Sequence, residues 1–171
     1  MDSSAYDTIK GLRVTRSYLA RPLDRGDLEA ILEAGRWTGS SKNRQGWVLV
    51  VMEDAAARER LATAGDFTDP IRNAAAAVAL VKTADGNDFD IGRLAQNLML
   101  AAATRGVGSC PVTLHHTEIV HGVLGLPDDQ SCRFAVALGY PDPVAEEAGR
   151  ALRRAAGMWG RKPPDEVIKR G

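Results

Sequence analysis

What this sequence has little of excludes several classes of protein. Its two cysteines, Cys110 and Cys132, are too few for a disulfide framework, and its three histidines lack the spacing of a common metal site. Basic and acidic residues balance at 22 each, without the basic excess typical of nucleic-acid-binding proteins. No apolar run reaches the roughly 18 residues of a membrane span. We therefore expect no metal, nucleic-acid or membrane partner, and the absence of a signal-peptide core predicts a cytoplasmic protein.

Size and composition are those of an ordinary globular domain. The chain has 171 residues, of which 44% are hydrophobic and 26% charged. A chain of this size buries roughly two-thirds of its unfolded surface, which is enough for a sizeable core. We expect a single domain over residues 1–171, with residues from about 159 to 171 as a polar C-terminal arm.

Three short apolar runs predict buried strands, and the segments between them predict helices. The strands are expected at 47–52, 76–81 and 134–138, although the alanines of 76–81 leave a helix possible there. Three helices are expected to begin at capping residues: one from Asp27 to Gly35, one from Asp54 to Gly65, and one from Thr117 through Leu124. Two more are expected over 90–105, ended by Gly106, and over 144–158. Strands that alternate with helices are typical of a layered α/β or α+β domain.

Basic residues are concentrated at the two ends of the chain. They are Arg13, Arg16, Arg21, Arg150, Arg153, Arg154, Arg161, Lys162, Lys169 and Arg170. If the two ends meet in space, they form one anion-binding region. In R-V-T-R-S-Y (13–18), two arginines with Ser17 can grip a phosphate, because guanidinium offers several donors in a fixed fork; a solvated basic turn is the alternative. W-G-R-K-P-P (159–164) offers a second phosphate contact through Arg161 and Lys162, or a frayed tail.

Two loop segments between these ends could contact a ligand. T-G-S-S-K-N-R-Q-G-W (38–47) carries short polar groups that can surround the edge of a heterocycle, or form an ordinary helix-to-strand turn. G-V-G-S-C-P-V-T (106–113) allows close backbone approach to a ligand but lacks the G-x-G-x-x-G of a Rossmann loop. Cys110 is interpreted as a small buried residue rather than a nucleophile, and Cys132 as lying beside the core. His115 and His116 are expected at the surface, within reach of a ligand bound at 106–113.

Taken in order, six segments resemble the FMN-dependent nitroreductase superfamily. They are R-V-T-R-S-Y at 13–18, S-S-K-N-R-Q-G-W at 40–47, D-I-G-R-L-A-Q-N-L-M-L-A-A at 90–102, G-V-G-S-C-P-V at 106–112, L-G-L-P at 124–127 and A-L-G-Y-P at 137–141. The resemblance spans most of the chain, in the family's order and at about its spacing. It implies an α+β, three-layer sandwich with a central, mainly antiparallel sheet flanked by helices, in an intertwined homodimer.

The resemblance also implies where FMN binds, at two equivalent sites in the dimer interface. The phosphate-binding segment matches Arg13, Val14, Thr15, Arg16 and Ser17, with Arg161 and Lys162 expected to reach the same phosphate from the partner chain. The loop that touches the ribityl chain and the ring matches Ser40, Ser41, Asn43 and Gln45. The strand that faces the ring matches Pro111, Val112, Thr113 and Leu114. Asn43 and Thr113 are candidates for tuning the flavin, and Thr113 or His115 for a side-chain acid or base.

The chain departs from the family's pattern at several places. Leu12 and Val14 stand where arginine and serine are usual, which leaves fewer side chains to bind the phosphate. Gly46 replaces a usual proline. The helical excursion that often covers the substrate pocket is reduced to about Lys82–Phe89, which implies a more open site.

The activity implied is transfer of electrons from NADH or NADPH to a small organic acceptor, such as a nitroaromatic or a quinone, by a ping-pong mechanism. The redox chemistry would belong to the flavin and the binding to the protein. Three alternatives stay open: a flavin-dependent dehydrogenase or oxidase, a flavin-sequestering protein without activity, and an interaction module without cofactor. The sequence leaves the acceptor and the choice between NADH and NADPH open, and a deazaflavin could replace FMN.

Overall fold

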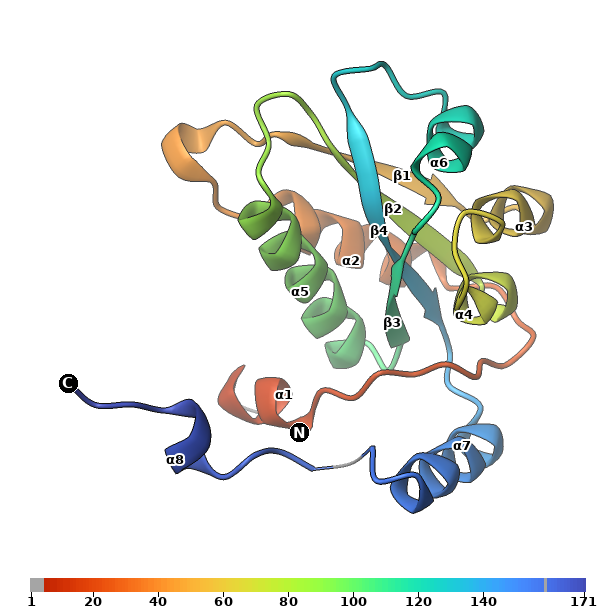
Figure 1. Cartoon of the computed structure of the whole chain (residues 1–171). Helices are drawn as coiled ribbons and strands as arrows, with labels where there is room; N and C mark the ends of the chain where they lie inside the picture. The colour runs from red at the N-terminus through yellow and green to blue at the C-terminus, as the bar shows by residue number, and fades with distance from the viewer. Residues whose placement is uncertain (1–4, 159) are drawn as a thin grey trace.

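Four antiparallel strands form the central sheet of the protein, shown in Figure 1 as a computed structural model that describes residues 5–158 and 160–171. The strands are β1 (Trp47–Met52), β2 (Ala76–Lys82), β3 (Gly108–Thr113) and β4 (Ser131–Gly139). They lie in the order β1-β2-β4-β3, and every pairing within the sheet is antiparallel. A parallel bridge between Val14 and Ser109 attaches the N-terminal segment to the outer edge of β3.

Helices cover both faces of this sheet, which confirms the three-layer α+β architecture. Two of them, α2 (Arg25–Arg36) and α5 (Asp88–Thr104), lie on one face, and α3 (Ala55–Ala62), α4 (Asp69–Asn73) and α6 (Thr117–Leu124) lie on the other (Figure 1). The remaining helices are α1 (Ala5–Gly11), α7 (Pro143–Ala155) and α8 (Pro164–Val167), with a 3-10 turn at Ser41–Asn43. Within the described ranges, no helix is long and apolar enough to cross a membrane.

The alternation of side chains along the strands produces two separate cores. On β2, Ala77 and Ala79 face the layer of α3, α4 and α6, while Val78 and Leu80 face α2 and α5. The same alternation runs along β4, so both central strands are buried on both faces. This explains why the two strands appear in the sequence as continuous apolar runs.

Some helix boundaries follow the predicted capping signals, and two predicted N-terminal caps need correction. Asp54 caps α3 by accepting a hydrogen bond from the backbone N–H of Ala57, as predicted. The cap of α2 is Asp24 rather than Asp27, because the Asp24 carboxylate accepts from two backbone N–H groups of the first turn. Thr117 is the first residue of α6 and not its cap, which is His116.

Other boundaries differ because packing extends or shortens the elements. Gly35 does not stop α2 but lies buried inside it, where a Cβ atom would come within 2.7 Å of the Leu98 side chain. The third helix of the chain ends at Ala62, three residues before Gly65. The polar residues Ser131–Arg133 extend β4 beyond the predicted apolar run. Three short helices, α1, α4 and α8, were not predicted, since none of them is long enough for a periodic pattern.

Candidate functional site

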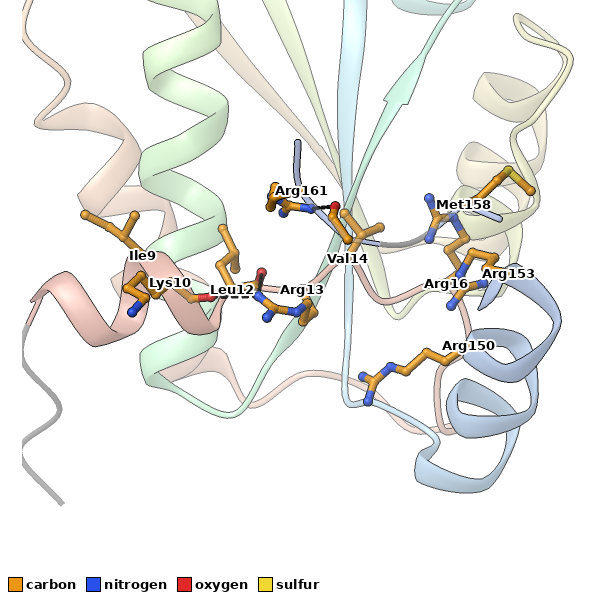
Figure 2. Close-up of a pocket in the computed structure, with 11 residues that line it drawn as sticks. Ile9, Lys10, Leu12, Arg13, Val14, Arg16, Arg150, Arg153, Met158 and Arg161 are labelled. Carbon is orange, nitrogen blue, oxygen red and sulfur yellow. Dashed lines mark hydrogen bonds between the residues drawn. The ribbon is translucent and has the colours of Figure 1, made fainter. Parts of the chain in front are cut away.

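The two basic ends of the chain meet in one open pocket (Figure 2), which is the condition under which the sequence indicated an anion-binding region. The pocket has a volume of about 730 Å³ and lies where the N-terminal segment, α7 and the C-terminal arm come together. Six of its lining residues are cationic: Lys10, Arg13, Arg16, Arg150, Arg153 and Arg161. The remaining lining residues are Ile9, Leu12, Val14, Met158 and Gly160.

The N-terminal wall of the pocket is held in an extended conformation beside β3. Val14 bridges to Ser109, and the backbone N–H of Thr15 donates to the Ser109 carbonyl at 2.9 Å. Because side chains alternate along an extended segment, Val14 and Arg16 line the pocket while Thr15 is buried between them, against Gly108. The Arg13 guanidinium donates to the carbonyls of Lys10 and Leu12, which keeps this side chain at the mouth of the pocket.

A buried carboxylate joins this wall to α7. Glu146 is only 2% exposed, and its Oε1 accepts the backbone N–H groups of Arg16 and Ser17 at 2.5 and 2.7 Å. Its Oε2 accepts no hydrogen bond but lies 3.9 Å from Arg150 Nε and 3.7 Å from Arg153 Nη2. The backbone N–H of Asp142 also donates to the Ser17 carbonyl at 3.0 Å. These contacts attach the first turn of α7 to the pocket wall.

The C-terminal arm forms the remaining side of the pocket. Arg161 lines it within the same chain, and its guanidinium donates to the Gly160 carbonyl at 2.9 Å (Figure 2). Lys162 lies outside the lining and pairs with Glu166 at 3.7 Å. Ser17 also lies outside the lining. Trp159, the start of the predicted arm, lies outside the described residues.

The loop at 40–46 has an unusual backbone. Lys42, Asn43 and Gln45 all have positive φ angles, between 50° and 54°, which side-chain-bearing residues seldom adopt. The Ser40 hydroxyl accepts the backbone N–H of Gln45 at 2.8 Å, and the Gln45 amide donates to Asn43 Oδ1 at 3.1 Å. The predicted residues Ser40, Asn43 and Gln45 therefore lie together in one self-bonded loop, with Ser41 at the start of its 3-10 turn. Backbone strain of this kind is concentrated at functional sites.

The short connection between β2 and α5 packs directly against this loop. The backbone N–H of Thr83 donates to the Gly46 carbonyl, and Gly86 lies so close that a Cβ atom on it would be 2.1 Å from the Gly46 oxygen. This contact accounts for glycine at position 46, because a Cβ atom there would meet the backbone of Gly86 at 2.5 Å. The short connection between β2 and α5 thus packs against the loop and supports its backbone.

The strand predicted to face a ring is β3, at the edge of the sheet. Pro111 is exposed, Thr113 is half-buried, and Val112 and Leu114 are buried in the core. Cys110 and Cys132 are also buried, as predicted. Burial raises the pKa of the Cys110 thiol to about 11, so it remains protonated and unreactive near neutral pH.

The two histidines that follow β3 are exposed, as predicted, and gather around one carboxylate. His116 Nε2 lies 3.0 Å from Asp66 Oδ1, and His115 Nδ1 lies 3.8 Å from Asp66 Oδ2. The exposed ring of Phe67 meets His115 edge to face, with 6.5 Å between the ring centroids. In the described part of the chain, no three His, Cys, Asp or Glu side chains gather as metal ligands.

The pocket and the loop lie at opposite ends of the sheet. Gly108 pairs with Gly139 beside the pocket, whereas Trp47, which follows the loop, pairs with Lys82 at the other end. Along β4, eight residues at roughly 3.3 Å each separate Gly139 from Ser131, the partner of Lys82, and the loop and β3 also flank opposite edges of the sheet. Within one chain, the structure therefore unites the two basic clusters but keeps the polar loop apart from them.

The chemistry of the pocket fits an anion with several acceptor oxygens. Arginine offers planar pairs of donors that match phosphate oxygens, and the six cations of the lining outnumber Glu146, the buried carboxylate that lies near Arg150 and Arg153. Sequence reasoning placed Arg13 and Arg16 here and expected Arg161 to arrive from the partner chain, whereas Arg161 lines the pocket of its own chain. The same reasoning missed the roles of Lys10 and Glu146, although the spacing of Glu146, Arg150 and Arg153 at i, i+4 and i+7 shows that they share one helix face.

Comparison with known proteins gives one consistent result. The family model described as "Nitroreductase family" matches residues 9–84 and 69–140 of this chain. A protein of Archaeoglobus fulgidus described as an NADH dehydrogenase/NAD(P)H nitroreductase is 27% identical over 140 residues, which cover 75% of this chain and 80% of the relative. The NADPH-flavin oxidoreductase of Vibrio harveyi is 26% identical over 164 residues, covering 84% of this chain and 68% of the relative.

The likeness extends to the three-dimensional structure. The crystal structure of nitroreductase A from Vibrio parahaemolyticus superimposes with a TM-score of 0.84 and 25% sequence identity. The superposition covers 99% of this chain and 76% of the other, so it includes α7 and the C-terminal arm.

Proposed function

The chain belongs to the nitroreductase family and is an oxidoreductase of that type, and on this premise we propose that it binds FMN and passes electrons from NADH or NADPH to an organic acceptor. The observation that carries the proposal is the cationic pocket where the two ends of the chain meet. Arg13, Arg16 and Arg161, which the family resemblance matches to the phosphate-binding segments, all line it. A flavin phosphate is an anion of the kind that such a donor set binds.

The names of the relatives support the choice of cofactor and donor. One is described as an NAD(P)H nitroreductase and another as an NADPH-flavin oxidoreductase. We propose that the phosphate of FMN is held at the pocket and that β3 runs beside the ring. Pro111–Thr113 would then present backbone groups to the ring, and Asn43 would act as a donor near its polar edge.

We propose that the complete site needs a second copy of the chain, because the loop at 40–46 lies at the far end of the sheet from the pocket of its own chain. The loop of one protomer would then approach the pocket and β3 of its partner. Exposed apolar side chains offer a surface for this assembly, since contiguous exposed apolar area marks interaction sites. Tyr6 and Ile9 lie on α1, Phe89 lies on α5, and Trp37 directly follows α2.

An apolar groove in the same layer supports the homodimer. It has a volume of about 290 Å³ and lies between α1, α2 and α5. Its lining residues are Ala5, Thr8, Ile9, Ala34, Asn97, Leu100, Ala101 and Thr104. We propose that residues 1–171 act as one domain and that the arm beyond residue 158 also contributes to the dimer.

This arrangement gives the cofactor and the protein separate roles. FMN, when bound, would supply the redox chemistry that links the nicotinamide to the acceptor in two separate half-reactions. The arginines hold the phosphate, and donors from the loop lower the cost of negative charge on the ring's polar edge. Because only a short turn joins β2 to α5, the entrance would stay open to acceptors of several shapes.

The proposal is tested with the visible spectrum of the purified protein, recorded before and after anaerobic addition of NADH or NADPH. An oxidised-flavin band that bleaches within seconds and returns on addition of a nitroaromatic or a quinone supports the oxidoreductase described. A band that persists with both donors would instead favour an oxidase-type or sequestering role. A protein that stays colourless after incubation with FMN contradicts the cofactor assignment.

The dimer is tested separately by measuring the molar mass in solution. The expected mass is twice that of the 18.3 kDa chain. A monomer that still binds FMN and turns over would show that one chain makes a complete site.

A further inference from the structure

We infer that α7 supplies a second half of the phosphate site, in which Arg150 and Arg153 bind the phosphate directly and Glu146 positions them. This inference rests on the proposed FMN site and extends it to residues that the family resemblance does not assign. It begins from the weakness of the N-terminal half, where Leu12 and Val14 replace the usual arginine and serine. Both of these apolar side chains line the pocket, so the N-terminal segment offers few donors of its own.

Arginines from α7 lie where the missing donors are needed. Arg150 and Arg153, both on α7, line the same pocket as Arg13 and Arg16 (Figure 2). Their side chains are 34% and 25% exposed, so they are partly desolvated but still open to a ligand. Hydrogen bonds between guanidinium and phosphate are stronger than those between neutral groups, and more so where water is partly excluded.

Glu146 fixes the rotation of α7 that brings these arginines to the pocket. Residues 146, 150 and 153 fall on one face of the helix, so fixing Glu146 in place also orients Arg150 and Arg153. Glu146 is firmly held, because its carboxylate is buried and accepts hydrogen bonds from the backbone N–H groups of Arg16 and Ser17. Few other contacts hold this helix, since its remaining links to the body of the domain are made by its N-terminal turn and the preceding residues.

The ion-pair geometry leaves the two arginines available. Arg150 and Arg153 lie 3.9 and 3.7 Å from Glu146 Oε2, which is too far for a normal hydrogen bond. That oxygen accepts no hydrogen bond in the structure although it is buried. Glu146 therefore attracts both guanidinium groups without saturating their donors, and these donors can turn to a phosphate in the pocket.

Substitutions that remove the two charges test the direct contacts. Arg153→Gln and Arg150→Gln are each expected to weaken FMN binding about tenfold, which is typical of one lost charge-assisted hydrogen bond. Affinity for riboflavin, which has the same ring but no phosphate, should remain within about twofold of wild type. Arg154→Gln is the matched control, because it removes the same charge from the same helix at a side chain that pairs with Glu147 and does not line the pocket.

The positioning role of Glu146 is tested by a double-mutant cycle. Glu146→Ala should weaken FMN binding at least as much as either arginine substitution, while Arg153→Gln added to Glu146→Ala should have little further effect. Glu147→Ala, at the exposed neighbouring carboxylate, is the control and should leave FMN affinity unchanged. A Glu146 that only repels the phosphate would give the opposite sign, with tighter FMN binding in Glu146→Ala.

The outcomes separate this inference from the proposed function. If wild type binds FMN more tightly than riboflavin but all α7 variants match wild type, the α7 site is overturned and the FMN assignment stands. If wild type binds neither flavin, the proposed function itself fails. Thermal unfolding of each variant shows whether the chain is folded, and the two arginine variants keep the test decisive if Glu146→Ala does not fold.

Discussion

The contact between Gly46 and Gly86 gives a sharp test of how the short β2–α5 connection supports the 40–46 loop. In Gly86→Ala, the new methyl group would lie 2.1 Å from the Gly46 carbonyl oxygen and 3.1 Å from that of Thr83. Real contacts of this kind are at least about 3 Å long, so the backbone must shift by roughly 1 Å. Overpacking of this size costs about 2 kcal/mol of unfolding free energy. For a chain of this length, that loss lowers the melting temperature by about 4–8 °C.

Thermal unfolding of Gly86→Ala measures the effect, and Gly122→Ala provides the matched control. Gly122 lies in α6 with no atom within 4 Å of its would-be Cβ. Alanine there should raise stability by about 0.5–1 kcal/mol, because it is the better helix former. FMN affinity should also fall in Gly86→Ala, since the displaced turn carries the loop with it. A Gly86→Ala protein that melts at or above the wild-type temperature would refute the close backbone contact.

Three further predictions concern the core, the buried thiols and α7. Leu98→Ala should lower the unfolding free energy in urea by about 2–5 kcal/mol, because Leu98 is fully buried; a smaller loss would mean that the site collapses around the gap. Burial raises the pKa of both Cys110 and Cys132 from 9.0 to about 11, so stability should fall as the pH rises from 9 to 11 while only the unfolded thiols ionise. Replacing both cysteines by alanine should make this loss of stability with pH smaller. A variant that loses as much stability as wild type over the same pH range would contradict the prediction. Asp142→Ala removes the side-chain acceptor for two backbone N–H groups at the start of α7. Calorimetry should show a loss of about 1 kcal/mol of stability together with weaker FMN binding. Unchanged FMN binding would show that the pocket does not need an ordered α7.

Much of the fold could be predicted from the sequence because its strongest signals are local. The apolar run at 76–81 is β2, which is buried as predicted, whereas the similar run at 47–52 forms β1, an edge strand on which only Met52 is buried. The cap of α2 was misplaced because Asp24 and Asp27 are equally good capping residues in the sequence. Which of them caps the helix depends on where the preceding chain turns, and that is set by tertiary contacts.

The site was predictable in its charged residues but not in its buried one. Clusters of arginine are visible in the sequence, whereas the burial of Glu146 arises only when α7 folds back onto the N-terminal segment. The backbone of the 40–46 loop was equally hidden. Positive φ angles are usually signalled by glycine, but here they fall on Lys42, Asn43 and Gln45.

The location of the pocket and the loop at opposite ends of one sheet has a consequence for how the protein behaves on dilution. In the proposed dimer, each flavin is held by groups from two chains, so cofactor retention obeys mass action in protein as well as in flavin. A concentrated solution would keep its colour through gel filtration, whereas the same sample at nanomolar protein would release flavin without any change of buffer. Assays at low enzyme concentration would then understate the activity unless FMN is added, and the specific activity would rise with protein concentration until the dimer is saturated.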